Sequence, residues 1–196
     1  MRPDHTTGGE ARGGAWSTRD VVLGGVFAAL TAVGAQVETP LPFSPVPVVL
    51  SNFFAVLAGL TLGARLGAMS QVAYALAGVA GLPVFAGLRG GGAVLAGPTG
   101  GYLVGFVLAA AVAGALRGPL PIGSRRAAWA AAAAAAVIYV PGVPWLAATT
   151  GMSAHRAFFV GVLPFLPGDA LKTVAAAIVA PSLARVAATR TGRLAL

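Results

Sequence analysis

The chain alternates long apolar segments with short connections rich in glycine, proline or arginine. A helix needs about 20 predominantly apolar residues to cross the hydrocarbon core of a bilayer. Six segments approach or reach that length, namely 20–37, 48–63, 67–80, 100–116, 127–146 and 157–180. The pattern therefore predicts six membrane-spanning helices. The second and third are short and meet at 63–67, and Pro141 and Pro144 should bend or end the fifth.

Composition decides the medium around these segments. Hydrophobic residues make up 57% of the 196 positions and charged residues 9%, whereas a soluble domain carries roughly 25% charged residues. Such a chain cannot cover a water-facing surface, so the sequence predicts an all-α integral membrane protein, and its net charge of +8 is better explained by membrane topology than by nucleic-acid binding. The chain has no cysteine, which excludes disulfides and cysteine-based metal sites.

The ends of the chain differ from its middle. Residues 1–18 are polar and glycine-rich, which predicts a disordered cytoplasmic tail. Residues 19–185 form the predicted membrane domain, and 186–196 a basic cytoplasmic tail.

Arginine placement predicts the orientation. With the N-terminus in the cytoplasm, ten arginines fall in inner segments, namely Arg2, Arg12, Arg19, Arg65, Arg117, Arg125, Arg126, Arg185, Arg190 and Arg193. Only Arg89 and Arg156 fall outside. Because cytoplasmic segments of membrane proteins carry an excess of positive residues, both termini should face the cytoplasm.

Two of the outer connections are unusual. Residues 38–47 contain four prolines, so we expect a stiff, extended connection. Residues 81–98 are long, glycine-rich and apolar. A connection of this kind is expected to fold back into the bundle, over a site, where protein can satisfy its backbone.

Candidate binding chemistry gathers around two motifs. Asp169 and the chain's only lysine, Lys172, lie in an apolar segment, where each charge costs a few kcal/mol. Spaced i, i+3, they share a helix face. They form either a structural ion pair or part of a polar binding site, and Pro164 and Pro167 should disturb the helix beside them.

The second motif is GPTGGYL (97–103), in which Thr99 is expected to cap the following helix. Exposed backbone amides at the start of that helix favour a polar ligand. The alternative is that the motif serves only as a helix cap with tight packing.

No catalytic set is expected. His5 lies in the N-terminal tail and His155 in a short connection. Neither a serine–histidine pair nor the two histidines and glutamate of an HExxH zinc site occurs at the required spacing. The sequence predicts no metal and no cofactor.

Four blocks together resemble one family. PLPFSPVPVVL (40–50), GLPVFAG (81–87), GPTGGYLVGF (97–106) and PFLPGDALK (164–172) look like the biotin-specific substrate-binding subunit, BioY, of energy-coupling factor transporters. The resemblance runs in order over most of the chain. It implies a multi-pass plasma-membrane protein that captures biotin from outside with high affinity. It also implies two kinds of partner, a transmembrane coupling subunit and a pair of cytoplasmic ATPases.

The resemblance also assigns residues. It implies that Asp169 and Lys172 bind the ligand, with polar residues of the glycine-rich region, matched by Thr99 and Gly100. Small residues on the first helix, matched by Ala28 and Ala32, would dock the coupling subunit. Gly24 extends the same four-residue repeat.

Biotin's chemistry fits this set. An anionic tail, an apolar ring and a ureido group require a cation, acceptors and an aromatic wall. Lys172 or Arg89 is expected to meet the carboxylate, and Asp169, with Asn52 as a helper, the ureido N–H groups. Tyr102, Phe85 and Trp145 are the expected wall. We expect Asp169 and Lys172 to act mainly as ligand-binding groups and only secondarily as an ion pair with each other. Replacing either with a neutral residue of similar shape should therefore cost little stability.

Two alternatives remain at this point. The same scaffold would suit another small vitamin or anion. An intramembrane hydrolase using Asp169 is the alternative from a different class, but the apolar segments supply no second catalytic acid, base or metal ligand.

The orientation is open to a direct test. A single cysteine placed within 38–47 should react with a membrane-impermeant thiol reagent added outside cells, because that connection is predicted to be outer. A cysteine placed after Arg190 should not react, and the native chain gives no background because it has no cysteine. The reverse labelling pattern would overturn the orientation.

Overall fold

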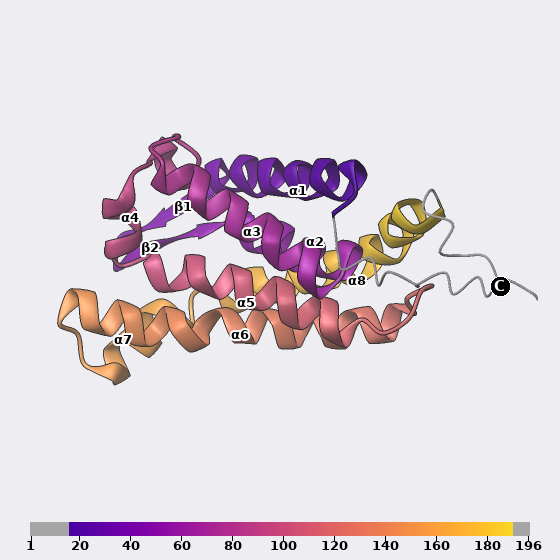
Figure 1. The fold of residues 1–196 in the computed structure, drawn as a ribbon. Helices are drawn as coiled ribbons and strands as arrows, with labels where there is room; N and C mark the ends of the chain where they lie inside the picture. Colours follow the sequence, from indigo (N-terminus) through magenta and orange to yellow (C-terminus); the bar gives the residue numbers. More distant parts are fainter. Residues whose placement is uncertain (1–15, 190–196) are drawn as a thin grey trace, which may run out of the picture.

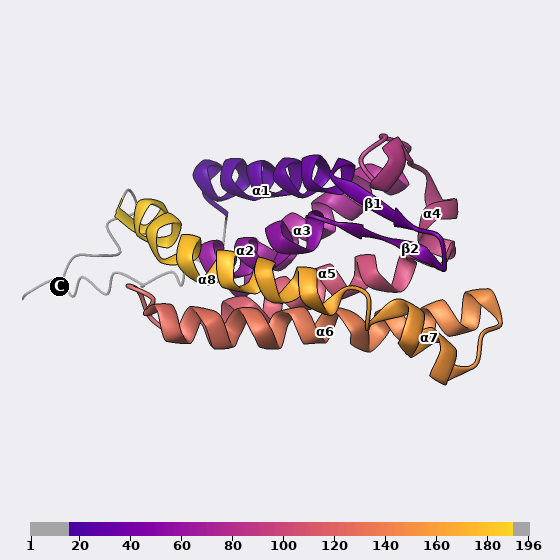
Figure 2. The same ribbon diagram turned by 180° about the vertical axis from the view of Figure 1, so that it is seen from behind.

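The computed structural model describes residues 16–189 (Figures 1 and 2). The tails are predicted at 1–18 and 186–196, and their residues 1–15 and 190–196 lie outside the described residues. Helices and strands follow in the order α1 (Thr18–Gln36), β1 (Glu38–Leu41), β2 (Ser44–Val49), α2 (Ser51–Leu62), α3 (Ala64–Val79), the 3₁₀ turn η1 (Ala86–Leu88), α4 (Gly92–Ala96), α5 (Gly100–Leu116), α6 (Ser124–Thr150), α7 (Ala154–Gly161) and α8 (Leu166–Thr189). Helix α8 runs past residue 185, where the C-terminal tail is predicted to begin.

The long helices form a bundle whose two ends differ. Helices α1, α2, α3, α5, α6 and α8 run lengthwise and alternate in direction (Figure 1). The hairpin, α4 and α7 gather at one end, on the left in Figure 1, whereas α1 begins and α8 ends at the other. Within the described part, three helices are long and apolar enough to cross a membrane: Thr18–Gln36, Ser124–Thr150 and Leu166–Ala187. Helices α2 and α5 are apolar but shorter.

Local sequence explains where α1 begins. The Ser17 hydroxyl accepts a hydrogen bond from the Asp20 backbone N–H at 3.1 Å. The Asp20 carboxylate accepts in return from the Ser17 backbone N–H, also at 3.1 Å. This reciprocal capping satisfies two amides that the first turn of a helix otherwise leaves without partners.

Small residues bring α5 close to its neighbours. A Cβ at Gly59 of α2 would lie 2.1 Å from the Ala110 carbonyl oxygen of α5, and one at Gly105 of α5 would lie 2.6 Å from the Ile138 carbonyl oxygen of α6. Alanines of α6, including Ala130, Ala131 and Ala134, are buried in the same contact layer. In an apolar medium helices associate through such close packing, which explains how the alanine-rich helix α6 packs against α5.

The proline-rich connection is a hairpin. Strands β1 and β2 pair antiparallel, with Glu38 opposite Val49 and Leu41 opposite Ser44, and the register is irregular between Thr39 and Leu41. The prolines favour extended backbone, as the sequence predicts, but the pairing was not predicted. Because β2 continues to Val49, α2 begins at Ser51 rather than at residue 48.

Proline has different effects in the last two predicted spans. The sixth segment, predicted as 157–180, is divided into α7 and α8 by the turn 162–165, which contains Pro164. Helix α6, by contrast, includes both Pro141 and Pro144 and continues to Thr150, so these prolines do not end it.

Candidate functional site

A cavity lies at the end of the bundle that carries the hairpin and α4. Its empty space is about 670 Å³ when the open mouth is counted. Aromatic side chains supply much of its wall, namely Tyr74, Phe85, Tyr102, Phe106 and Phe165. Its polar lining consists of Ser51, Asn52, Arg89, Thr99, Tyr139, Asp169 and Lys172.

Asp169 and Lys172 form an ion pair in this lining. The Lys172 Nζ lies 3.2 Å from Asp169 Oδ1, and the two side chains are 15% and 8% exposed, respectively. Lys172 Nζ also donates to the Val49 carbonyl oxygen at 2.6 Å and to Asn52 Oδ1 at 2.9 Å. An ammonium group has three donors, so every donor of Lys172 has a protein acceptor.

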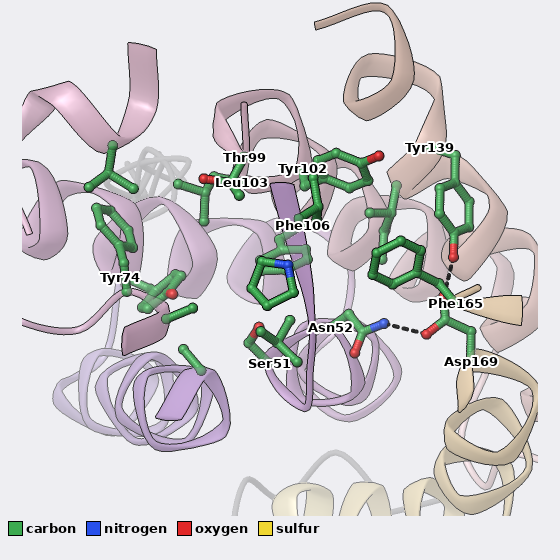
Figure 3. A pocket seen from close by; sticks show the side chains of 18 of the residues that line it. Ser51, Asn52, Tyr74, Thr99, Tyr102, Leu103, Phe106, Tyr139, Phe165 and Asp169 are labelled. Atoms are coloured by element: carbon green, nitrogen blue, oxygen red, sulfur yellow. Dashed lines mark hydrogen bonds between the residues drawn. The ribbon is translucent and has the colours of Figure 1, made fainter. Parts of the chain in front are cut away.

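The carboxylate of Asp169 also has several protein partners. Asn52 donates to Asp169 Oδ1 through Nδ2 at 2.8 Å, and the Tyr139 hydroxyl donates to Oδ2. Figure 3 shows Asn52 and Tyr139 approaching the carboxylate from different helices. The four side chains, together called the polar cluster (Asn52, Tyr139, Asp169 and Lys172), therefore join α2, α6 and α8.

The break before α8 places this cluster. The turn 162–165 ends with Phe165, and the Asp169 backbone N–H bonds the Phe165 carbonyl oxygen at 2.8 Å. Asp169 thus lies in the first turn of α8, where the positive end of the helix dipole favours a carboxylate. Lys172, three residues later, projects from the same side and reaches the end of β2.

Seven predicted ligand residues line the cavity: Asn52, Phe85, Arg89, Thr99, Tyr102, Asp169 and Lys172. Gly100 and Trp145 do not. Trp145 is 40% exposed, and its Nε1 donates to the Gly97 carbonyl oxygen at 3.0 Å. The structure therefore places Trp145 beside the GPTGGYL motif and away from the wall.

The structure adds detail on three of the lining residues, and one of them, Thr99, differs from the prediction. Thr99 makes no capping hydrogen bond through its side chain, so it does not cap α5 as predicted. The Tyr102 hydroxyl donates to the Gly161 carbonyl oxygen at 2.9 Å, which leaves its ring as the part that forms the wall. Arg89 is exposed and bonds the Ala86 carbonyl oxygen through Nε at 2.9 Å.

Sequence reasoning missed Tyr139 and Ser51 as lining residues. The available signal for Tyr139 is a hydroxyl-bearing side chain in an alanine-rich and aliphatic segment, just before PGVP. Ser51 is fully buried at the start of α2, next to Asn52. Both residues belong to other helices than Asp169, so no sequence spacing indicates that they lie near it.

The predicted docking residues on α1 do not share one environment. Gly24 is buried, and a Cβ there would lie 3.4 Å from Leu66 Cδ1 of α3. Ala28 and Ala32 are half-buried and pack against the core. Gly24 is therefore part of the internal contact between α1 and α3.

The filled donors of Lys172 generate a stability prediction that differs from the one drawn from the sequence. Asp169→Asn or Lys172→Met alone leaves one charge without its partner, which should destabilise the fold by about 3–5 kcal/mol. The double variant leaves no uncompensated charge and should melt above either single variant. Thermal melting of the three purified proteins in mild detergent without ligand measures this order. Single variants that melt like the parent would show that the pair contributes little to the fold.

Known proteins share this architecture. The BioY family model matches residues 7–189. A probable biotin transporter BioY from Pyrococcus horikoshii is 42% identical over 84% of this chain and 96% of that protein, and the biotin transporter BioY from Thermotoga maritima is 39% identical over 86% and 97%, respectively. A crystal structure of the S-component for biotin from an ECF-type ABC transporter shares the fold, with a TM-score of 0.76 and 22% identity over 87% of this chain and 95% of that one. The chain therefore belongs to the BioY family.

Proposed function

We propose that this chain captures biotin at the outer face of the plasma membrane and serves as the substrate-binding subunit of an energy-coupling factor transporter. The observation that carries the proposal is a polar cluster, with one carboxylate and one ammonium group, in a cavity whose wall is otherwise mainly aromatic and aliphatic. Two relatives, matched by this chain over nearly their full length, are named as a probable biotin transporter and a biotin transporter. The chain itself is a binding subunit and not an enzyme, and ATP hydrolysis belongs to separate partner subunits.

The proposed topology has six spans, with both termini in the cytoplasm. The alternating directions of α1, α2, α3, α5, α6 and α8 support it (Figure 1). The cavity then opens to the outside, since the hairpin and residues 81–98 lie at that end. The arginine distribution supports the same orientation.

The charges around the cavity suggest an orientation for biotin. Within the described part of the chain, Arg89 has a protein acceptor only at Nε, whereas Lys172 has acceptors for all three donors. A guanidinium group matches a carboxylate with two parallel hydrogen bonds. We therefore place the biotin carboxylate at Arg89 and the ureido group at the polar cluster, where Asp169 accepts from its N–H groups and Lys172 exchanges one protein acceptor for its carbonyl oxygen.

Ligand affinity tests this assignment. Each lost charge-assisted hydrogen bond is worth roughly 1.5–3 kcal/mol, so Asp169→Asn and Lys172→Met should each weaken biotin binding about 10- to 150-fold. Arg156→Met removes an exposed outer cation that does not line the cavity and serves as the control. Titration of purified, folded variants with biotin measures the affinities. Parental affinity in both cluster variants would show that biotin binds elsewhere.

Mass spectrometry of small molecules co-purified in mild detergent tests the identity of the ligand itself. Biotin should be released from the parent and be depleted in Asp169→Asn. Release of a different vitamin or anion would favour the same scaffold with another specificity.

Coupling to the partner subunits generates a separate prediction. We propose that the transmembrane coupling subunit packs against α1 at Ala28 and Ala32, since small side chains allow helices to approach closely. Replacing both with leucine should abolish biotin uptake by cells and leave binding to the purified chain intact, because neither residue lines the cavity. Ala29→Leu adds one leucine at an exposed position of α1 and is the control, with Ala28→Leu and Ala32→Leu alone as the variants that match it in bulk. A parallel loss of binding and uptake would show that Ala28 and Ala32 serve internal packing only.

A further inference from the structure

A glutamine at the end of α1 is hydrogen-bonded to the segment 84–89 of the long connection. Gln36 Nε2 lies 3.3 Å from the Val84 carbonyl oxygen and 3.2 Å from that of Phe85. Its Oε1 accepts from the Leu88 backbone N–H at 3.0 Å. Gln36 does not itself line the cavity. One amide side chain therefore holds backbone groups from three residues of a connection that lies about 50 positions later in the chain.

The held segment has an unfavourable backbone shape. Phe85 and Arg89 pair with each other, the Phe85 N–H lying 2.9 Å from the Arg89 carbonyl oxygen and the Arg89 N–H 3.3 Å from that of Phe85. The backbone turns between them at Gly87, with φ 69°, and Leu88, with φ 55°. Glycine adopts this left-handed region readily, but leucine does not, because its Cβ approaches the neighbouring carbonyl.

Side-chain burial does not compensate this strain, since Leu88 is 68% exposed. Strained conformations persist only where the surroundings hold them. At Leu88, the backbone N–H donates a hydrogen bond to Gln36 Oε1, which lies outside the segment. Without Gln36, Leu88 is therefore expected to leave the left-handed region and the turn 85–89 to open.

The segment forms part of the cavity wall. Phe85, Ala86 and Arg89 line the cavity, and the Phe85 ring is 2% exposed and packs edge-on against Tyr74 at 5.6 Å between centroids. A change in the turn would shift both the aromatic wall and the cation proposed to meet the ligand carboxylate. We propose that Gln36 is a positioning residue that keeps segment 84–89 in its ligand-binding shape and thereby slows ligand release. The ligand part of this inference rests on the proposed function.

The chain contains a matched control. Its only other glutamine, Gln71, is fully buried and bonds the Thr31 hydroxyl at 3.2 Å and the Ser70 hydroxyl at 3.1 Å, within the contact between α1 and α3. It makes no hydrogen bond to segment 84–89 and does not line the cavity. Gln71→Leu therefore removes the same chemical group from a helix contact without touching the segment.

Hydrogen–deuterium exchange of the ligand-free, full-length protein tests the structural step. Peptides covering 84–90 should exchange faster in Gln36→Leu than in the parent, because the Leu88 N–H loses its acceptor. Gln71→Leu should leave their exchange unchanged. Because this readout needs no ligand, it remains decisive if the ligand is not biotin. Parental exchange in Gln36→Leu would overturn the proposal.

Biotin dissociation from the same proteins tests the functional step. Loss of two or three neutral hydrogen bonds should speed release from Gln36→Leu about 10- to 100-fold. Glycine at position 88 tolerates the left-handed backbone, so the double variant Gln36→Leu/Leu88→Gly should regain slow release. A fast-release phenotype that Leu88→Gly does not rescue would overturn the proposal, because Gln36 would then act through the stability of α1. Faster exchange together with absent biotin binding in the parent would support the positioning role and refute biotin as the ligand.

Discussion

The bundle must hold two opposite charges in an apolar surrounding, and much of the architecture at the cavity end follows from this constraint. A charged side chain within a membrane protein requires a nearby partner or water. Lys172 and Asp169 have both each other and neutral partners: Asn52 from α2, Tyr139 from α6 and the Val49 carbonyl oxygen at the end of β2. Satisfying the pair therefore fixes how α8 lies against α2 and α6 and where the hairpin ends.

The break between α7 and α8 makes this arrangement possible. A continuous helix would place Asp169 in the middle of a span. The turn 162–165 instead puts Asp169 in the first turn of α8, where the positive end of the helix dipole favours the carboxylate. The same turn lets Phe165 enter the cavity wall. Irregular backbone is tolerated in a membrane protein where it lines a cavity, and Phe165 of this turn does so.

The sequence predicts the features that depend on local pattern. Apolar segments locate the long helices, and the motif blocks contain five of the seven predicted residues that line the cavity, namely Phe85, Thr99, Tyr102, Asp169 and Lys172. It misses features that depend on contacts between distant segments. The prolines of 38–47 indicate extended backbone, but not the pairing of Glu38 with Val49. Tyr139 joins Asp169 across a helix interface, and Trp145 is aromatic and close in sequence to Tyr139 yet points to Gly97. Which of these two residues faces the cavity depends on the direction of its side chain around α6. The amino-acid composition of the segment does not reveal that direction.

The closed polar cluster also bears on selectivity. In the structure, the ammonium donors of Lys172 and both carboxylate oxygens of Asp169 already have protein partners. An entering acceptor must therefore replace one of the partners of Lys172, whereas an entering donor can also add a bond at Asp169 Oδ2, which has one protein donor. A simple anion would be attracted by Lys172 but repelled by Asp169. A simple cation would be attracted by Asp169 but repelled by Lys172. A neutral group that presents both donors and an acceptor, as a ureido group does, is able to exchange bonds with both charges at once. In a cavity with an aromatic wall, where water competes weakly, such matched exchange is favourable and an unmatched polar group is costly. The pairing of the charges thus excludes ions of either sign more strongly than a single charge would.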